Sequence, residues 1–332
     1  MGWLEVFFDI SVYAYLLALI AYTVWFLWRG PKPWVSGTVL LALGAACQVA
    51  FIIAMGAVAG RPPFSNTFET MVLFSACVAG FYLALLWGVD WKPLAPGVAF
   101  AALLVSLLAY VPMQDELDPL VPALRDNLLL TIHVLFCFVS YAAFLLAYVG
   151  AITHLWKNER HHPGAVAALA LSVTTLVAGV VLSTLAGTTL WKDSRGAALA
   201  VAALGAVVAA GALWPALFFG GRKLRIRDRL PEEETLQKTV YRMVALGFPF
   251  LTLGIITGSY WAKQAWGRYW GWDDKEVASL VTWLVFAAYL HVRLVPRWRG
   301  TWISWVAVAG FWCVVFTFLG VNYLLGGLHA YA

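Results

Sequence analysis

Residues 126–144 read "DNLLLTIHVLFCFVSYAAF", and the apolar run continues to residue 156. No Asp, Glu, Lys or Arg interrupts the run between residues 128 and 156. A run of about 20 apolar residues is long enough to cross the hydrocarbon core of a bilayer as a helix. Because water is absent there, the backbone must satisfy its own hydrogen bonds, and runs of this length do so as α-helices rather than barrel strands. The stretch therefore predicts a transmembrane helix at 128–156.

Runs of this kind recur along the whole chain, which is 62% hydrophobic and only 12% charged, with a mean hydropathy of +0.81. Such a composition exceeds what a water-soluble core requires and is typical of a polytopic membrane protein. We therefore expect one integral membrane domain over residues 1–332, folded as an all-α helical bundle with about ten transmembrane helices. No cleavable signal peptide is expected, because the first apolar run is long enough to span a bilayer and lacks a basic start. The predicted helices are 6–28, 35–58, 67–89, 93–111, 128–156, 164–186, 197–219, 240–262, 276–295 and 302–325.

The distribution of Lys and Arg predicts how this bundle is oriented. If the N-terminus lies outside, most of the 22 basic residues fall in segments on the inner side, including the run "GGRKLRIRDRLPEEE" at 220–234. Both chain termini and residues 263–276 then lie on the outer, periplasmic-type side. Positive-inside bias and anionic lipid account for the net charge of +5, so no nucleic-acid partner is expected.

Several kinds of chemistry have no counterpart in the sequence. The cysteines fall inside apolar segments without paired spacing, so we expect them to pack rather than form disulfides, a thiol redox pair or a zinc site. There is no nucleophilic triad, no phosphate-binding glycine loop and no pattern for a metal-activated water. We expect no catalytic residue distinct from a ligand-binding site. The four cysteines are Cys47, Cys77, Cys137 and Cys313.

The stretch "AWGRYWGWDDKEVASLVTW" at 265–283 joins a cluster of tryptophans to a cluster of charges. An aromatic belt at the membrane interface explains any single Trp, but a belt spreads over many helix ends, whereas these rings share one predicted outer loop, 263–276. Their flat faces, with Arg268 and Lys275 beside them for acidic substituents, suit a flat apolar ligand. A porphyrin with two propionates, a quinone and a lipid head group all fit that description. The candidate ligand-binding residues are Trp266, Gly267, Arg268, Tyr269, Trp270, Trp272, Asp273, Lys275 and Glu276.

Histidines matter here because imidazole is the usual ligand for the iron of a haem held without covalent bonds. His133, near the outer end of helix 128–156, and His329, just beyond the last predicted helix, flank the tryptophan-rich loop. Taken singly, each is also explained as a hydrogen-bonded core or interface histidine. His291 lies about 24 Å further inward by helical rise, so it is either a ligand at another site or a neutral, paired or snorkelling side chain. The remaining three, which we expect in a solvated basic loop on the inner side, are His154, His161 and His162.

Residues 265–294, "AWGRYWGWDDKEVASLVTWLVFAAYLHVRL", resemble the tryptophan-rich WWD signature of membrane proteins that handle haem in cytochrome c maturation. Four further blocks resemble the CcsA/ResC family of System II cytochrome c biogenesis: "RPPFSNTFETMVLF", "LTIHVLFCFVSYAAF", "YRMVALGFPFLTLGIITGSYWA" and "FLGVNYLLGGLHAYA". The similarity runs in the same order from about residue 60 to the end of the sequence.

The resemblance implies that the chain transports haem across the membrane and presents it to apocytochrome c, as the CcsA-like subunit of a CcsB/CcsA cytochrome c synthase, a lyase. Haem b (iron protoporphyrin IX) is then the transported substrate, and His133 and His329 match its two external ligands. His291 matches the intramembrane ligand, whose counterpart would come from the CcsB/ResB-like partner subunit. The chemistry is addition of the two thiols of a CxxCH segment across the haem vinyl groups.

The same resemblance implies further partners and a location. The partners are apocytochrome c, which carries the CxxCH segment, and thiol-reducing maturation proteins. The location is the bacterial cytoplasmic membrane, or the thylakoid membrane for a plastid-derived protein.

The sequence departs from the family pattern at one position of the motif. Where the family usually reads Trp-Asp-Pro-Lys-Glu, this chain has Asp274 in place of the proline, which removes a fixed φ angle and adds a charge. Helices 164–186 and 197–219 also stand where relatives often have a more polar segment. Two other interpretations stay open: a CcmC-like or CcmF-like haem-handling protein of another maturation pathway, and a membrane transporter that binds a quinone or a lipid.

Overall fold

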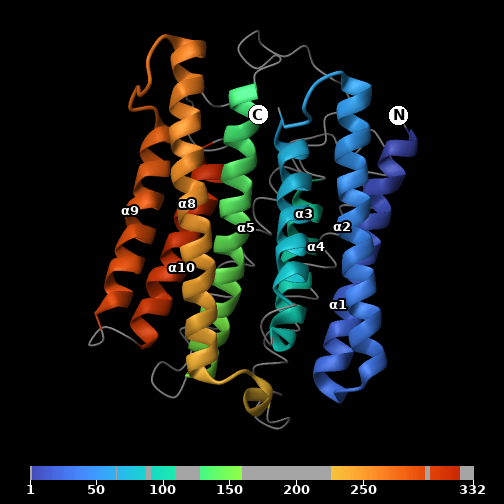
Figure 1. Cartoon of the computed structure of the whole chain (residues 1–332). Coiled ribbons are helices and arrows are strands. Elements are labelled where there is room, and N and C mark those ends of the chain that lie inside the picture. Colours follow the sequence, from blue (N-terminus) through green and yellow to red (C-terminus); the bar gives the residue numbers. More distant parts are fainter. Residues whose placement is uncertain are drawn as a thin grey trace, which may run out of the picture.

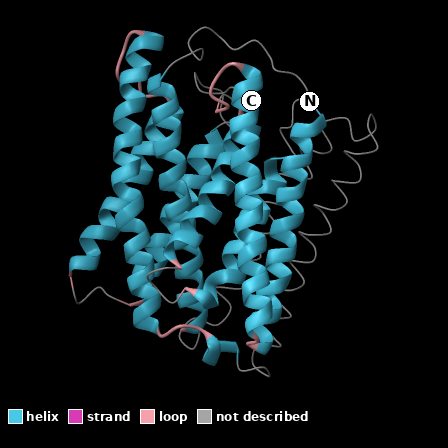
Figure 2. Ribbon diagram, turned by 45° about the vertical axis from the view of Figure 1, so that its right-hand side comes forward, coloured by secondary structure: helices cyan, strands magenta, loops and turns pink. Residues whose placement is uncertain are grey.

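The computed structural model describes residues 2–64, 66–86, 91–109, 128–158, 226–295 and 300–321. The regular structure in these ranges is helical throughout, and eight helices are long and apolar enough to cross a membrane (Figures 1 and 2). The predicted all-α, polytopic membrane bundle is thereby confirmed. The predicted helices at 164–186 and 197–219 lie outside the described residues, as does His329, so the total of about ten spans and the side of each terminus stay predictions.

The helices begin and end close to the predicted limits. A clear difference is at α8, which begins at Glu233 rather than near residue 240, because its polar first turns extend the helix beyond the apolar run. The long helices are α1 (Gly2–Trp28), α2 (Pro31–Ala59), α3 (Thr67–Leu85), α4 (Ala95–Ala109), α5 (Leu128–Lys157), α8 (Glu233–Trp266), α9 (Asp274–Leu294) and α10 (Thr301–Val315). The short elements are two 3₁₀ turns, η1 (Lys92–Leu94) and η4 (Ile226–Arg229), and a π-helical turn, η6 (Phe316–Gly320), that continues α10.

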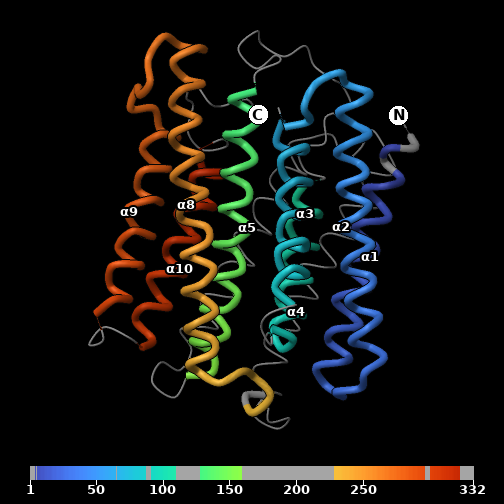
Figure 3. Tube along the Cα trace, viewed as in Figure 1, coloured from blue at the N-terminus to red at the C-terminus, as the bar shows by residue number. Residues whose placement is uncertain are grey.

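The described helices form two groups that lie side by side (Figure 1). In one group α1 packs on α2 and α4, and α3 packs on α2 and α4; in the other α5 packs on α8 and α10, and α9 packs on both. The contact between α3 and α5 joins the two groups. The turn from α8 to α9 and the start of α5 lie at one end of the bundle, here called the tryptophan end, as the trace in Figure 3 shows. The start of α8 and the end of α5 lie at the opposite end, here called the basic end after the basic run at 220–234 that precedes α8 along the chain.

The first group is held together by buried polar side chains from each of its helices. Tyr15 donates to the Gln48 side-chain oxygen at 2.9 Å, and the Gln48 amide donates to Ser106 at 2.9 Å. Ser106 in turn lies 2.8 Å from Ser75 on α3. All four side chains are fully buried. Within a membrane such interhelical hydrogen bonds stabilise a particular register, because a partner lost there is not replaced by water.

The contact between α5 and α8, by contrast, depends on small residues. A Cβ atom built at Gly247 would lie 2.7 Å from the Phe144 ring, and one at Gly254 would lie 2.8 Å from the Cys137 sulfur. Small residues on one face of a helix let the two backbones approach closely, which is how packing stabilises helix pairs in lipid. The close approach brings the last turns of α8 directly against the first half of α5, where His133 lies.

Candidate functional site

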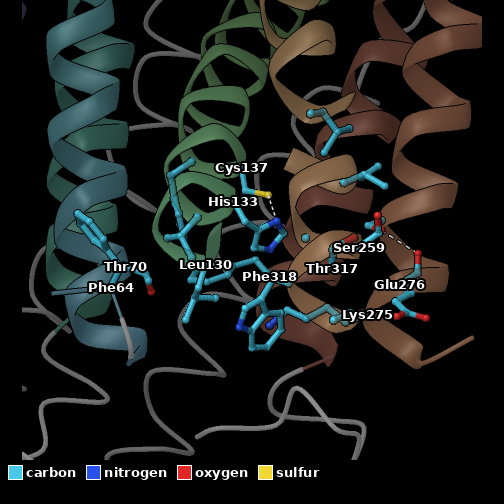
Figure 4. Close-up of a pocket in the computed structure, with 18 of the residues that line it drawn as sticks. Phe64, Thr70, Leu130, His133, Cys137, Ser259, Lys275, Glu276, Thr317 and Phe318 are labelled. Carbon is cyan, nitrogen blue, oxygen red and sulfur yellow. Dashed lines mark hydrogen bonds between the residues drawn. The ribbon is translucent and has the colours of Figure 1, made fainter. Parts of the chain in front are cut away.

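A cleft of about 180 Å³ opens at the tryptophan end, between the start of α3, the first half of α5, the last turns of α8 and the start of α9 (Figure 4). Its walls are mostly aromatic and aliphatic, with a few polar side chains, which is the composition expected for a small-molecule site. Residues from both helix groups contribute. The lining residues used below are Phe64, Asn66, Thr70, His133, Cys137, Gly258, Trp261, Tyr269, Trp270, Lys275, Glu276, Thr317 and Phe318.

His133 projects from α5 into this cleft and is half-buried. Its Nδ1 atom lies 2.7 Å from the carbonyl oxygen of Gly254 on α8. A carbonyl oxygen only accepts, so Nδ1 donates the proton, and in the neutral imidazole the lone pair resides on Nε2. An imidazole whose Nδ1–H is held by a backbone carbonyl has the tautomer and fixed ring orientation typical of metal-ligating histidines.

The turn that follows α8 is shorter than the predicted loop at 263–276. α8 continues to Trp266, Gly267 ends it in the left-handed conformation with φ of 76°, and α9 begins at Asp274. The non-helical part is therefore 267–273. Gly267 suits this position because a left-handed residue with a Cβ atom is strained.

The charges of "DDKE" at 273–276 order this turn. Asp273 is the N-cap of α9, and its carboxylate accepts from the backbone N–H of Lys275 at 3.4 Å. Glu276 completes a capping box, since its Oε2 atom accepts from the backbone N–H groups of Asp273 at 3.2 Å and Gly271 at 2.7 Å. The capping box thus fixes both the first turn of α9 and the backbone that carries the tryptophans. These carboxylates were predicted to bind a ligand, although their D-x-x-E spacing could have indicated a capping box.

Asp274 occupies the first position of α9, and its side chain is exposed. At that position the backbone N–H has no intrahelical acceptor, so proline is well tolerated there. An acidic residue is also favourable, because the N-terminal end of a helix carries partial positive charge. The replacement of the family's proline by Asp274 therefore does not prevent α9 from beginning at this residue.

The aromatic residues of the motif point in different directions. Tyr269 and Trp270 line the cleft. Trp272 is 71% exposed and has a positive φ of 57°. Its ring meets that of Trp270 edge-on, with the ring centroids 5.9 Å apart. Trp266 is not among the lining residues; it packs edge-on against buried Trp261, with ring centroids 4.8 Å apart. Trp261, which the sequence interpretation did not include, contributes to the wall from α8.

The motif's charged residues are likewise divided. Lys275 reaches from α9 toward the middle of the cleft, and Glu276 lies at its edge (Figure 4). Arg268 is exposed and outside the lining set; its guanidinium lies against Gly271, where a Cβ atom would be 2.6 Å from it. Among the described residues that line the cleft, Lys275 is thus the one cation placed to meet an acidic group on a ligand.

The α3 side of the cleft was not predicted as part of the site. Phe64, Asn66 and Thr70 line it, and Asn66 caps α3 by accepting from the Glu69 N–H at 2.8 Å. The Glu69 carboxylate is 1% exposed and pairs with both terminal nitrogens of Arg61 at 3.0 and 3.1 Å. This two-point ion pair fixes the connection between α2 and α3. The block "RPPFSNTFETMVLF" was the only sequence signal for this wall.

Of the other predicted ligands, His291 is the one that the described residues include, and it is not brought to the cleft. His291 is exposed on α9, near the basic end, well away from His133 along the bundle. His329, His161 and His162 lie outside the described residues. His154 differs from the prediction: instead of lying in a solvated loop it is fully buried, with Ser304 2.9 Å from its Nδ1 and Glu233 3.2 Å from its Nε2. The physical reason is that α5 and α8 extend to the basic end and enclose this ring against α10.

The donor set indicates what kind of ligand the cleft suits. Within the described ranges no group of three or more His, Cys, Asp and Glu side chains could hold a bare metal ion. A single oriented imidazole at an apolar, aromatic-lined cleft suits a metal that brings its own equatorial ligands, as the iron of a haem does. Lys275 would then lie beside an acidic group of that ligand.

Comparison with known proteins identifies relatives over most of the chain. The family described as "Cytochrome C assembly protein" matches residues 64–329, a segment that contains every described residue lining the cleft. The cytochrome c biogenesis protein CcsA of Synechocystis sp. is 35% identical, with 99% of this chain and 97% of that protein covered. The CcsA protein of Picosynechococcus sp. is 36% identical, covering 89% and 87%. That of Gloeobacter violaceus is 36% identical, covering 81% and 78%.

Proposed function

The chain belongs to the cytochrome c assembly protein family, in its CcsA branch, and on that premise we propose that it handles haem during cytochrome c maturation. The protein moves haem b across the membrane and presents it to apocytochrome c for thioether attachment. It does so as the CcsA-like subunit of a synthase completed by a CcsB/ResB-like membrane subunit. The bacterial cytoplasmic membrane is the proposed location, or the thylakoid membrane if the protein is plastid-derived.

The observation that carries this proposal is the orientation of His133. Its Nδ1–H is directed at the Gly254 carbonyl, so the lone pair of the neutral imidazole is on Nε2, and the residue lines a cleft together with Tyr269 and Trp270. An axial haem ligand requires this tautomer. The second external ligand is His329 by family resemblance, and His291, exposed on α9, would serve an intramembrane site shared with the partner subunit.

The residues of this chain contribute mainly by positioning the substrate. The haem supplies the vinyl groups, and each thiol of the CxxCH segment adds its S–H bond across one of them, so no external group is lost. His133 would hold the macrocycle in one orientation, the aromatic walls would exclude water, and Lys275 would meet an acidic substituent. Holding reacting groups in place is worth several orders of magnitude in rate, which leaves little need for a separate acid or base.

The proposal is tested by co-expressing the chain with a CcsB-like subunit in a host stripped of other maturation systems. The purified complex should show a Soret band and should mature a reporter cytochrome c. The Soret band should weaken in His133→Gly and in His329→Gly, and exogenous imidazole should restore part of it by replacing the missing ligand. A double variant that kept both its haem spectrum and cytochrome maturation would contradict the assignment.

The same experiment separates the alternatives. If maturation required a separate soluble haem chaperone, a CcmC-like or CcmF-like role would replace the proposed one. If the pure protein contained no iron, a quinone-binding or lipid-binding transporter would be the better explanation. If maturation of the reporter increased when a chemical reductant was added, the system would require a thiol-reducing protein as a further partner.

A further inference from the structure

We propose that Gly258 is a positioning residue for His133: the missing side chain at this position of α8 lets the imidazole reach the Gly254 carbonyl. This inference deepens the proposed function and rests on it. Gly254 and Gly258 both precede the tryptophan-rich stretch at 265–283, so neither was among the candidate ligand-binding residues.

The geometry of an α-helix explains why residue 258 matters. The carbonyl of residue 254 points along α8 toward residue 258, four positions later, so a side chain at 258 stands beside any outside donor to that carbonyl. A Cβ atom at Gly258 would lie 2.6 Å from His133 Nδ1 and 2.7 Å from Cε1. Real Cβ atoms do not approach ring atoms so closely, so the ring could not keep its present position.

The contacts at Gly258 differ in kind from those at Gly254. All three atoms closest to a Cβ at Gly258 belong to the His133 ring, so the ring can move while the two helices stay in place. A Cβ at Gly254 would meet the Cys137 sulfur at 2.8 Å and the Cys137 backbone nitrogen at 3.4 Å. Gly254 therefore sets the spacing of α5 and α8, whereas Gly258 sets the place of the imidazole.

Loss of the Nδ1–H bond has a defined chemical consequence. A hydrogen bond from the distal ring nitrogen to a carbonyl fixes the tautomer and raises the basicity of the ligating nitrogen. A displaced ring would bind iron more weakly, and the less basic ligand would shift the midpoint potential of the haem to more positive values. Partner groups of this kind typically account for about 10- to 100-fold in metal affinity.

The test is Gly258→Ala in the complex co-expressed with its partner subunit. Alanine is a better helix former than glycine, so the change does not weaken α8 itself. We expect about 10- to 100-fold weaker retention of haem, a lower fraction of six-coordinate low-spin haem and a more positive midpoint potential. Unchanged potential and retention would overturn the inference.

Two matched controls separate positioning from packing. Gly80→Ala on α3 introduces a methyl group with no atom within 4 Å beyond its own helix backbone, and Gly97→Ala on α4 introduces one that meets the Val149 side chain at 2.9 Å, away from the cleft. Both should keep the haem spectrum of the wild type. If Gly97→Ala reproduced the effect of Gly258→Ala, a general packing defect would explain it and the inference would fail.

A double variant and a measurement without substitution complete the test. In a His133→Gly background supplied with imidazole, Gly258→Ala should change nothing further, because no tethered ring remains to collide; a persistent effect would overturn the inference.

In the haem-free wild type, ¹⁵N resonances assigned to His133 by their loss in His133→Gly should show a protonated Nδ1. The opposite tautomer would also overturn it. A wild-type complex that never contains haem would refute the proposed function instead.

Discussion

His133 and His154 lie on the same helix, α5, about 30 Å apart by helical rise, and their surroundings are opposite in character. His133 is half-buried at the tryptophan end, with one nitrogen bonded to a backbone carbonyl in an apolar cleft. His154 is fully buried at the basic end, and polar side chains from α8 and α10 approach both of its nitrogens. The first environment holds a ring in one orientation at a cleft, where we propose that it meets a ligand, and the second uses a ring to join helices.

The surroundings of His154 make this second role concrete. Its Nδ1 meets Ser304 of α10, and its Nε2 lies 3.1 Å from the Gln237 amide and 3.2 Å from the Glu233 carboxylate, both on α8. Gln237 also accepts from Arg293 of α9 at 3.0 Å. Four helices therefore meet through one side-chain network. The comparison teaches that two histidines on one helix acquire different surroundings from the neighbouring helices, whatever their residue type and helix share.

The largest expected effect is on haem binding, and its absence would break the comparison between the two histidines. His133→Ala should lower haem affinity by at least about 100-fold, since a direct ligand should count for more than the groups that orient one. Its free energy of unfolding in the haem-free state should stay close to that of the wild type, because the ring lies in a cleft rather than in a closed core. Haem titration followed at the Soret band measures the first quantity. Haem affinity unchanged by the substitution would contradict the ligand role.

His154→Ala should show the reverse pattern. Removing the buried ring leaves the buried Ser304 hydroxyl without this partner and creates a cavity, whereas water can reach the half-exposed Glu233, so the free energy of unfolding should fall by about 2 kcal/mol. The molecules that remain folded should bind haem as the wild type does. Denaturant titration of the haem-free protein in detergent, followed by tryptophan fluorescence, measures the stability. A loss of haem affinity at unchanged stability would assign His154 to a ligand site.

A smaller effect is expected at the capping box of α9, and it would sharpen the description of the tryptophan end. Glu276→Ala removes the carboxylate that accepts from the Gly271 and Asp273 N–H groups, which should cost about 1 kcal/mol of stability. Because the same turn carries Trp270, haem affinity should fall as well. Hydrogen exchange at the start of α9 should increase. Exchange unchanged in this turn would show that the cap does not order it.

The smallest effect is expected for Asp274→Pro. Asp274 stands at the first position of α9, where the backbone N–H needs no intrahelical acceptor, so the stability should change by less than about 0.5 kcal/mol. Haem affinity should also be retained. Lys275→Pro is the matched control, because the N–H of Lys275 donates to the Asp273 carboxylate. Equal losses in both variants would show that position 274 lacks the tolerance of a first helical position.

Parts of the site could be read from sequence because they depend on local chemistry. The D-x-x-E pattern at 273–276 specifies a helix start, and clustered tryptophans beside it indicate an aromatic surface. Which ring faces the cleft could not be read, since Trp270 and Trp272 are two residues apart in a non-helical turn without a fixed period. The role of His154 was missed for a related reason. The prediction ended the apolar run near it and placed the next residues in solvent, whereas α8 begins early enough to cover it.

The sequence by itself determined that this chain is a helical membrane bundle, because runs such as 128–156 are long enough to span a bilayer and a backbone in lipid must bond within its own segment. It also determined the family, through motifs that stand in order along the chain. Only the tertiary structure decided that His133 lines a cleft with its Nδ1–H held by a backbone carbonyl, while His154 joins helices. That choice depends on which carbonyls and side chains a neighbouring helix brings within about 3 Å. The α5–α8 contact through Gly254 and Gly258 makes that choice at His133, and no local pattern encodes it.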